Sequence, residues 1–183
     1  MVKKIFFVLY CGKFVLSLRR VKNVQMTMID FIGEYDCKVD AKGRILLPIQ
    51  FRKELGEVEA FCFVIKKHIF AHCLELYTKA AWEEQIGLIK DVIDPFNEED
   101  LQAQRDFRRG STIIECDPAG RVLLPARLLK QAEIGTDALL LGSEGRIEIW
   151  QPDLYFNSGG SDKERKERFK NTMAKRKAKK NDE

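Results

Sequence analysis

The sequence predicts a fold of the α+β class that is mainly β and is built from two copies of one structural unit. The first observation is a nine-residue phrase, Asp-x-x-Gly-Arg-(Ile/Val)-Leu-Leu-Pro, which occupies residues 40–48 and recurs 77 residues later at 117–125. Six of its nine positions are identical in the two copies. The second observation is that the same succession of apolar and polar segments follows both copies. A repeated sequence unit of this kind indicates a repeated supersecondary unit.

Each phrase predicts a tight turn followed by a short strand. Gly43 and Gly120 can adopt the positive φ that such turns require, and the side chains of Asp40 and Asp117 can accept hydrogen bonds from the backbone two residues on. The three apolar residues before each proline are enough for a short strand and too few for a helix. We therefore expect these aspartates and glycines to specify the turn in both copies.

Pro48 and Pro125 predict the start of a short helix in each unit. Proline is tolerated in the first helical turn, where its fixed φ suits the helix and its missing N–H leaves no bond unmade. Amphipathic segments follow at residues 49–55 and 126–132. A glycine after each segment is expected to end the helix. These glycines are Gly56 and Gly135.

An apolar hairpin is predicted after each short helix. Its strands are residues 60–65 and 73–77 in the first unit, and 138–141 and 147–150 in the second. The last strand of both hairpins reads apolar, Glu, apolar, aromatic, which is the period-two pattern of a half-buried strand. Entering strands are expected before the two turns, at residues 32–39 and 111–116.

Two helices are predicted between the units, at residues 79–90 and 97–109. Apolar residues in the first of them recur every three or four positions, so one face of that helix is apolar. From this pattern we expect the helices to pack in the core between the two units. The apolar residues are Trp82, Ile86, Ile89 and Ile93.

The doubled phrase resembles that of the MraZ family of bacterial transcriptional regulators. The resemblance covers residues 31–154 and includes Phe31-Ile32-Gly33-Glu34-Tyr35, Leu74-Glu75-Leu76-Tyr77 and Trp82. It implies two SpoVT-AbrB-type swapped-hairpin units in one chain, which intertwine into an AbrB-like pseudo-dimeric barrel with short packing helices. It also implies that the linking helices lie outside the barrel and contribute to contacts between subunits. The expected division is unit 1 at 34–81, a helical linker at 82–110 and unit 2 at 111–154.

Sequence-specific binding of double-stranded DNA is the activity that the resemblance implies. The expected targets are short direct repeats upstream of the division and cell-wall gene cluster, which includes the protein's own gene. Such a regulator works in the cytoplasm at the nucleoid as a ring-like homo-oligomer, without a cofactor, a metal or a membrane. Antitoxins of the same superfold usually carry one unit per chain, so the doubled unit favours the regulator.

The charge distribution restricts where DNA can bind. The net charge is +4, but residues 163–183 contain ten Lys/Arg and four Asp/Glu, and residues 1–25 contain six Lys/Arg and no acid. The body between them, residues 26–162, therefore has 16 basic and 24 acidic residues. Because an acidic body does not attract a polyanion as a whole, any contacts with DNA must be local.

The first turn holds the basic residues that are best placed to meet DNA. Lys42 and Arg44 flank Gly43, a glycine that allows close approach of the backbone, and Lys38 precedes them on the entering strand. A two-stranded β element can enter the major groove, where arginine can bind guanine O6 and N7 and lysine can bind phosphate. We therefore assign base reading to Arg44 and phosphate binding to Lys42.

The second turn is the weaker candidate for a DNA contact. Ala119 stands where the first turn has Lys42, and Pro118 stiffens the turn. Arg121 is therefore expected either to contribute weakly to DNA binding or to serve the fold and the ring contacts.

An alternative role within the fold stays open for the turn arginines. Arg44 can form an ion pair with Asp40 or Asp36, in which case the arginine would be structural.

Catalytic and metal sites are not expected. The five cysteines lack the spacing of a zinc site, and His68, His72 and Cys73 have no further ligand nearby that would complete four. A small hydrolase, the rival enzyme class, would need His68 or His72 as its base. A third class is an oligomeric protein-interaction scaffold without DNA specificity, which the acidic body favours and the basic first turn disfavours.

The two ends are expected to lie outside the repeated units. Residues 1–30 form an N-terminal extension, and we expect translation to start at Met26 or Met28. Its apolar run is interrupted by Lys13 and is too short to span a bilayer. Residues 155–183 are basic and poor in apolar residues, so we expect a disordered tail that adds salt-sensitive binding to DNA of any sequence.

Overall fold

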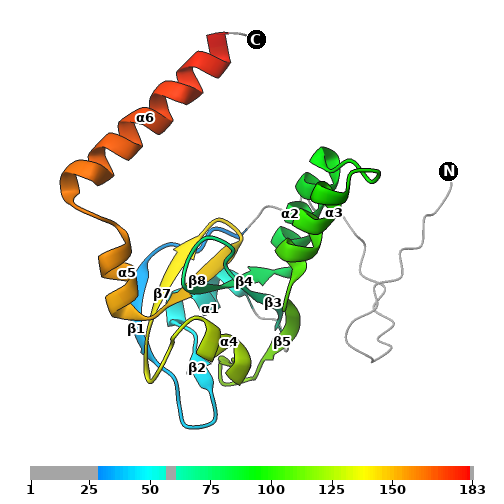
Figure 1. Ribbon diagram of the computed structural model, residues 1–183. Coiled ribbons are helices and arrows are strands. Elements are labelled where there is room, and N and C mark those ends of the chain that lie inside the picture. Colours follow the sequence, from blue (N-terminus) through cyan, green and yellow to red (C-terminus); the bar gives the residue numbers. More distant parts are fainter. Residues whose placement is uncertain (1–28, 57–60, 182–183) are drawn as a thin grey trace, which may run out of the picture.

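The computed structural model describes residues 29–56 and 61–181, which form eight strands and six helices (Figure 1). The expected N-terminal extension and start codon concern residues outside this range, apart from the last residues before Phe31. The strands are β1 (Glu34–Lys38), β2 (Arg44–Leu46), β3 (Phe61–Lys67), β4 (Cys73–Thr78), β5 (Thr112–Cys116), β6 (Arg121–Leu123), β7 (Asp137–Ser143) and β8 (Arg146–Trp150). The helices are α1 (Ile49–Leu55), α2 (Lys79–Val92), α3 (Glu98–Arg108), α4 (Ala126–Gln131), α5 (Pro152–Ser158) and α6 (Asp162–Asn181).

The two units are intertwined because strands of one unit pair with strands of the other. The antiparallel sheet has the order β1-β7-β8-β4-β3-β5-β6-β2. The entering strand β1 of unit 1 thus lies on the hairpin of unit 2, and the entering strand β5 of unit 2 lies on the hairpin of unit 1. A bridge between Val39 and Ile45 brings the two ends of the strand order together, so the sheet forms a nearly closed barrel. This arrangement confirms the predicted swapped-hairpin fold.

Reciprocal hydrogen bonds at the two glycine turns join β2 to β6. The carbonyl of Gly43 accepts the N–H of Leu124, and the carbonyl of Gly120 accepts the N–H of Leu47, each at 2.9 Å. Each turn is therefore bonded to the strand that follows the other turn. Both glycines have the left-handed backbone conformation that the turn chemistry predicts, with φ of +80° and +84°.

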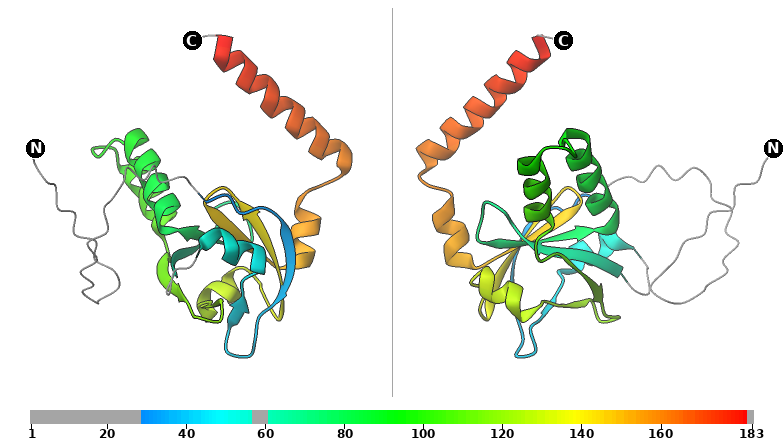
Figure 2. Two further views of the ribbon diagram at one scale, coloured as in Figure 1. Left: turned by 180° about the vertical axis from the view of Figure 1, so that it is seen from behind. Right: turned by 45° about the vertical axis from the view of Figure 1, so that its right-hand side comes forward.

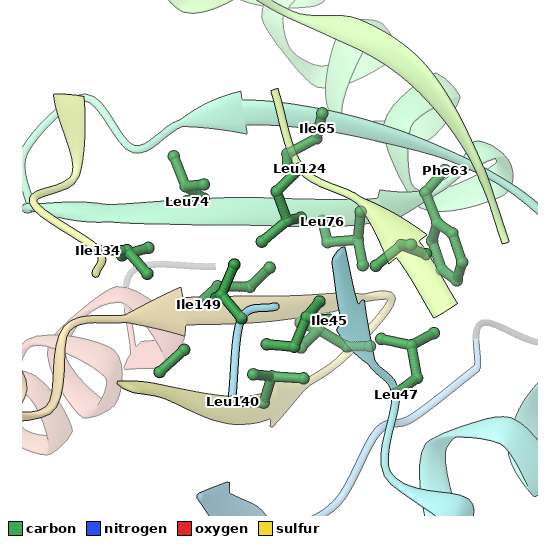
Figure 3. Packing of buried hydrophobic residues seen from close by; sticks show 14 of the residues in the cluster. Ile45, Leu47, Phe63, Ile65, Leu74, Leu76, Leu124, Ile134, Leu140 and Ile149 are labelled. Carbon is green, nitrogen blue, oxygen red and sulfur yellow. The ribbon is translucent and has the colours of Figure 1, made fainter. Parts of the chain in front are cut away.

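The core lies inside the barrel and receives apolar side chains from both units. Figure 3 shows Ile45, Leu76, Leu124 and Ile149 converging from four different strands and strand ends. The exposed fraction of each of these side chains is 1% or less. Burial of a leucine or isoleucine contributes about 1.5–3 kcal/mol, so the interleaved core is the main source of stability.

The short helices α1 and α4 both begin after the predicted proline. Only α1 ends at the predicted glycine. Pro48 and Pro125 stand at the N-cap, and their carbonyls accept the first helical hydrogen bonds. Gly56 ends α1 with φ of +74°.

The prediction that Gly135 ends the second short helix is wrong. Glu133 takes the left-handed conformation with φ of +58°. The N–H of Ile134 then bonds the carbonyl of Leu129 at 3.0 Å and the N–H of Glu133 bonds the carbonyl of Lys130 at 3.3 Å, which is the Schellman pattern. This end places Ile134 in the core. Core packing therefore outweighs the preference for glycine at the left-handed position.

The helical linker lies on the outer face of the barrel and not between the two units, so that expectation from the helix pattern is wrong. Helices α2 and α3 form a hairpin that stands on β3 and β4 (Figure 2). The Trp82 ring stacks on Phe107 with centroids 5.5 Å apart and meets Tyr77 edge-on. Ala81 is the one residue of α2 that is buried, because the barrel already fills its own interior.

A buried ion pair lies beneath this hairpin. Lys66 Nζ is 2.7 Å from Glu75 Oε2, and the Tyr77 hydroxyl donates to Glu75 Oε1 at 2.8 Å. Lys66 Nζ also lies 4.7 Å from the centroid of the Phe107 ring, so the ammonium links the sheet to α3. The sequence pattern put Lys66 in the polar break after residue 65, whereas β3 continues to Lys67 because Glu75 neutralises the buried charge.

The expectation of a disordered tail at residues 155–183 is not met, because α5 and α6 are helical. Ser161 and Glu164 cap the start of α6 reciprocally: Glu164 accepts the Ser161 N–H at 2.7 Å and donates its own N–H to the Ser161 hydroxyl at 3.3 Å. All side chains from 162 to 176 are exposed. Local capping and good helix formers thus form this helix without a packed face. None of the helices in the described ranges is long and apolar enough to cross a lipid bilayer.

We expect Gly120→Ala to destabilise the fold by about 1–3 kcal/mol. An alanine would be held at φ of +84°, and its Cβ would overlap the side chain of Arg52. The measurement is the urea midpoint of unfolding. Gly87→Ala in α2 is the matched control, since nothing lies within 4 Å of its Cβ, and it is expected to stabilise the chain slightly. Equal midpoints for Gly120→Ala and the unchanged chain would contradict the account of the turn.

Candidate nucleic-acid interface

The ribbon formed by β2 and β6 carries both arginines of the repeated phrase on one face. In the register, Arg44 is opposite Leu123 and Leu46 is opposite Arg121. The central pair, Ile45 and Val122, is fully buried in the barrel. Because side chains alternate along a strand, the other four point away from the core. We call these four residues the ribbon face: Arg44, Leu46, Arg121 and Leu123.

The ribbon face is compact because its cross-strand pairs are of the close type. The hydrogen bonds from Leu124 to Gly43 and from Leu47 to Gly120 mark the two flanking pairs as hydrogen-bonded. Hydrogen-bonded and non-hydrogen-bonded pairs alternate along an antiparallel ribbon, and side chains are closer in the second kind. Arg44–Leu123 and Leu46–Arg121 are therefore both pairs in which the side chains stand close together.

The first turn is organised by the carboxylate of Asp40. Its Oδ1 accepts the N–H groups of Lys42 and Arg44, both at 2.9 Å. Its Oδ2 accepts Arg44 Nε at 2.8 Å and lies 2.6 Å from Arg44 Nη2. These bonds lower the pKa of Asp40 to about 2, with the side-chain bond from Arg44 as the largest cause. The carboxylate is therefore ionised throughout the neutral range, and Arg44 is held beside it.

Within the described residues, the ion pair leaves one binding edge of Arg44 without a partner. A guanidinium has five N–H donors in a planar fork, and Asp40 engages the edge formed by Nε and Nη2. The Nη1 donors and the second Nη2 donor remain, and they form the end-on edge that can bind an acceptor pair bidentately. The open alternative of an ion pair with Asp40 is thus realised, but it orients the arginine without saturating it.

The second turn has the same backbone bonds as the first, but its arginine side chain is placed differently. Asp117 Oδ1 accepts the N–H of Ala119 at 2.9 Å and of Arg121 at 2.8 Å. The Arg121 side chain is exposed, and within the described residues its guanidinium has no ion pair. Of the two arginines, Arg44 is therefore the one whose side chain is bonded within its own turn.

The two halves of this surface differ in charge. Lys42 is exposed at the tip of the first turn, which projects at the bottom of Figure 1, and Ala119 takes its place in the second turn. Lys38 lies two residues before the first turn and Glu115 two residues before the second. Lys38 Nζ is 2.6 Å from Asp137 Oδ1, but both side chains are largely exposed, so the pair is weak and separable. The half that belongs to unit 1 is the more basic one.

The histidines and cysteine that invited a metal hypothesis do not converge. His68 Nδ1 accepts the N–H of Phe70 at 3.0 Å, and His72 Nδ1 lies 3.1 Å from Glu133 Oε1. Cys73 is buried, and burial raises the pKa of its thiol above its ordinary value. Within the part of the chain that the structure describes, no group of three or more His, Cys, Asp or Glu residues could hold a metal ion.

Reasoning from the sequence missed Leu46 and Leu123 as members of the surface. Both leucines follow an arginine by two positions, and this spacing places Leu46 on the same strand face as Arg44. The period-two rule could therefore have found each leucine next to its own arginine. The pairing of Arg44 with Leu123 could not be found in this way, because it depends on the exchange of strands between units.

Known proteins that are similar to this chain share its repeated organisation, because one family model matches the chain in two segments. The family model described as MraZ protein matches residues 31–102 and 107–175. A protein of Cytophaga hutchinsonii named Transcriptional regulator MraZ is 38% identical over 125 residues, which are 68% of this chain and 82% of that relative. Proteins with the same name from Phocaeicola vulgatus and Thermoanaerobacter sp. are each 35% identical, over 68% of this chain and 80% and 82% of their own lengths.

We expect Asp40→Asn to remove the ion pair and keep the turn, because the amide oxygen can still accept both backbone N–H groups. The lowered pKa of Asp40 means that the pair stabilises the folded chain above the ordinary carboxyl pKa of about 3.9 and that this stabilisation is lost as the pH falls toward about 2. The difference in unfolding free energy between the unchanged chain and Asp40→Asn should therefore be largest above about pH 4 and should decline as the pH falls through about 2.

Asp117→Asn is the matched control, because it alters an equivalent turn carboxylate to which no arginine side chain of the described residues is bonded. If Asp40→Asn and Asp117→Asn gave identical pH profiles, the ion pair would have no role in the stability of the turn.

Proposed function

This chain belongs to the MraZ family, and on that premise we propose that it is a DNA-binding transcriptional regulator. Its targets in this proposal are short direct repeats upstream of the division and cell-wall gene cluster, which includes its own gene. It acts by binding, without catalysis and without a cofactor, in the cytoplasm at the nucleoid.

The observation that carries the proposal is the ribbon face. A two-stranded antiparallel ribbon fits the major groove, and this one presents Arg44 and Arg121 on the side away from the core. The free end-on edge of Arg44 suits guanine O6 and N7, and the contact with Asp40 fixes its direction before DNA arrives. We therefore keep Arg44 as the base-reading residue.

The charge difference between the halves supports a division of labour. Lys42 at the exposed turn tip and Lys38 beside it can bind phosphates, and Gly43 gives the backbone close access. The second half has Ala119 and Glu115 at the equivalent places, so Arg121 makes the smaller contribution. Unlike Arg44, Arg121 must be ordered when it binds, which costs conformational entropy.

The basic helix α6 supplies a second, sequence-independent contribution in this proposal. Its residues 168–181 contain seven Lys/Arg and no acid. It extends from the side of the barrel opposite the first turn (Figure 1), so it would bind phosphates of a different stretch of DNA. A cationic helix is therefore a candidate for holding DNA nearby without reading it.

Assembly into a ring-like homo-oligomer is a further part of the proposal. The α2–α3 hairpin projects from the barrel and exposes large apolar side chains at its tip, which suits contact with another subunit. These side chains are Leu88, Val92 and Phe96, with exposed fractions of 55%, 79% and 95%.

The same apolar tip favours the second candidate function, an oligomeric protein-interaction scaffold without DNA specificity. The two candidates differ in what they need from the ribbon face. A scaffold does not need arginine donors on the ribbon face, whereas a DNA reader of this kind does.

Arg44→Ala is expected to reduce specific affinity for the upstream DNA by about 5- to 150-fold, because a bidentate contact with guanine discriminates by about 1–3 kcal/mol. Arg121→Ala should have a smaller effect. The measurement is a mobility-shift titration against that DNA and against a shuffled duplex. Lys90→Ala, an exposed cation on α2, is the control and should bind like the unchanged chain. If Arg44→Ala still discriminated between the upstream DNA and the shuffled duplex as well as the unchanged chain does, Arg44 would not be the base-reading residue.

Truncation after Ser161 is expected to make binding less sensitive to salt. The slope of log affinity against log salt concentration falls by about 0.9 for each phosphate contact that is lost on duplex DNA. Because α6 carries its cations away from the ribbon face, discrimination between the upstream and shuffled duplexes should stay the same. A truncated chain with the full salt slope would show that α6 does not contact DNA.

A further inference from the structure

We propose that Leu46 and Leu123 are specificity-determining residues that contact thymine 5-methyl groups next to the bases read by the arginines. This inference rests on the proposed function, since it concerns the same DNA complex. It adds a second chemical class of contact to the ribbon face, namely apolar readout beside hydrogen bonding.

Both leucines expose apolar side chains to solvent, which does not stabilise the folded chain. Their exposed fractions are 47% for Leu46 and 55% for Leu123, while the residues that alternate with them, Ile45, Leu47, Val122 and Leu124, are buried. Both lie on the ribbon face beside an arginine of the opposite strand. An apolar side chain on each half of a surface that is otherwise charged points to a partner that presents apolar groups among polar ones.

The major groove presents such groups. Thymine is the base whose edge carries a methyl group there, next to the acceptors on neighbouring pairs that arginine can bind. Leucine has no donor or acceptor, so placing it over a guanine or adenine edge would desolvate N7 without a replacement bond. A leucine in the groove therefore favours thymine through contact and disfavours purines through desolvation.

The register decides which leucine works with which arginine. Arg44 stands directly opposite Leu123, and Arg121 stands directly opposite Leu46. Cβ atoms in such pairs are about 4.5–5.5 Å apart, and successive base pairs are about 3.4 Å apart, so the two side chains of a pair reach bases one or two steps from each other. Each reading pair thus combines the arginine of one unit with the leucine of the other.

A second copy of the chain is the competing occupant of the ribbon face. Two copies that met through this face would bring Arg44 and Arg121 of one against those of the other, with Lys38 and Lys42 at the rim. Like charges at an interface oppose association, and the exposed apolar residues of the α2–α3 tip offer a surface without this penalty. Charge complementarity favours DNA on the ribbon face.

The test begins with selection of binding sites from a random-sequence duplex library, using the full chain, Arg44→Ala and Arg121→Ala. Positions at which selection for guanine is lost in each arginine variant mark the bases read by that arginine. In the selected site, each thymine is then replaced one at a time by deoxyuridine, which removes only the 5-methyl group.

We expect deoxyuridine at a thymine within two steps of the guanine read by Arg44 to weaken binding of the unchanged chain about fourfold, the effect of burying one methyl group. Leu123→Ala should show no loss on that substitution and should keep the loss at the thymine beside the guanine read by Arg121. Leu46→Ala should show the reciprocal pattern. Leu123→Val, which keeps an apolar side chain, should recover part of the methyl sensitivity.

Several outcomes would overturn the inference. A selected site without thymine near those guanines would do so, as would a full methyl effect in both leucine variants. Leucine variants that bind DNA normally but change oligomer size in light scattering would assign the face to a second copy. If the unchanged chain selects no sequence at all, both the proposed function and the leucine contact are wrong. If it selects a site that is insensitive to methyl removal, the leucine contact alone fails.

Discussion

The exchange of hydrogen bonds between the two phrase copies is the constraint on which the rest of the structure depends. Gly43 bonds Leu124 and Gly120 bonds Leu47, and these two bonds set the register of β2 against β6. The same register buries Ile45 and Val122 in the barrel and puts the four residues of the ribbon face outside. Fold and candidate site therefore share one cause, since a slip by one residue would bury the arginines and expose the core.

The shared scaffold makes the differences between the copies informative. Both aspartates make the same pair of backbone bonds, so the turns are equivalent as structures. What differs is the side-chain chemistry added to them. Arg44 is held by Asp40, and Lys38 and Lys42 belong to its turn region. Arg121 has no ion pair among the described residues, and Glu115 precedes its turn by two residues. An approximately symmetric frame thus presents an asymmetric surface, as expected when one half binds more strongly than the other.

Local sequence signals predicted the turns, helices and strands well. They did not predict which distant residues these elements contact. The doubled phrase was enough to predict both turns, α1 and the strand positions, because those depend on glycine, aspartate, proline and apolar alternation within a few residues. The end of α4 at Glu133 and the inclusion of Lys66 in β3 depend on Ile134 reaching the core and on Glu75 across the sheet, which no local window contains. The pairing of Arg44 with Leu123 depends on the strand exchange, which the family resemblance implied and no periodicity revealed.

A structure of the full chain bound to its selected duplex is the most direct test of the account. We expect the β2–β6 ribbon to lie in the major groove, with Arg44 still in contact with Asp40 while its end-on edge meets a base, and with Arg121 on the same duplex. A complex in which the ribbon face is covered by another subunit, or in which DNA lies on a different face of the barrel, would contradict it.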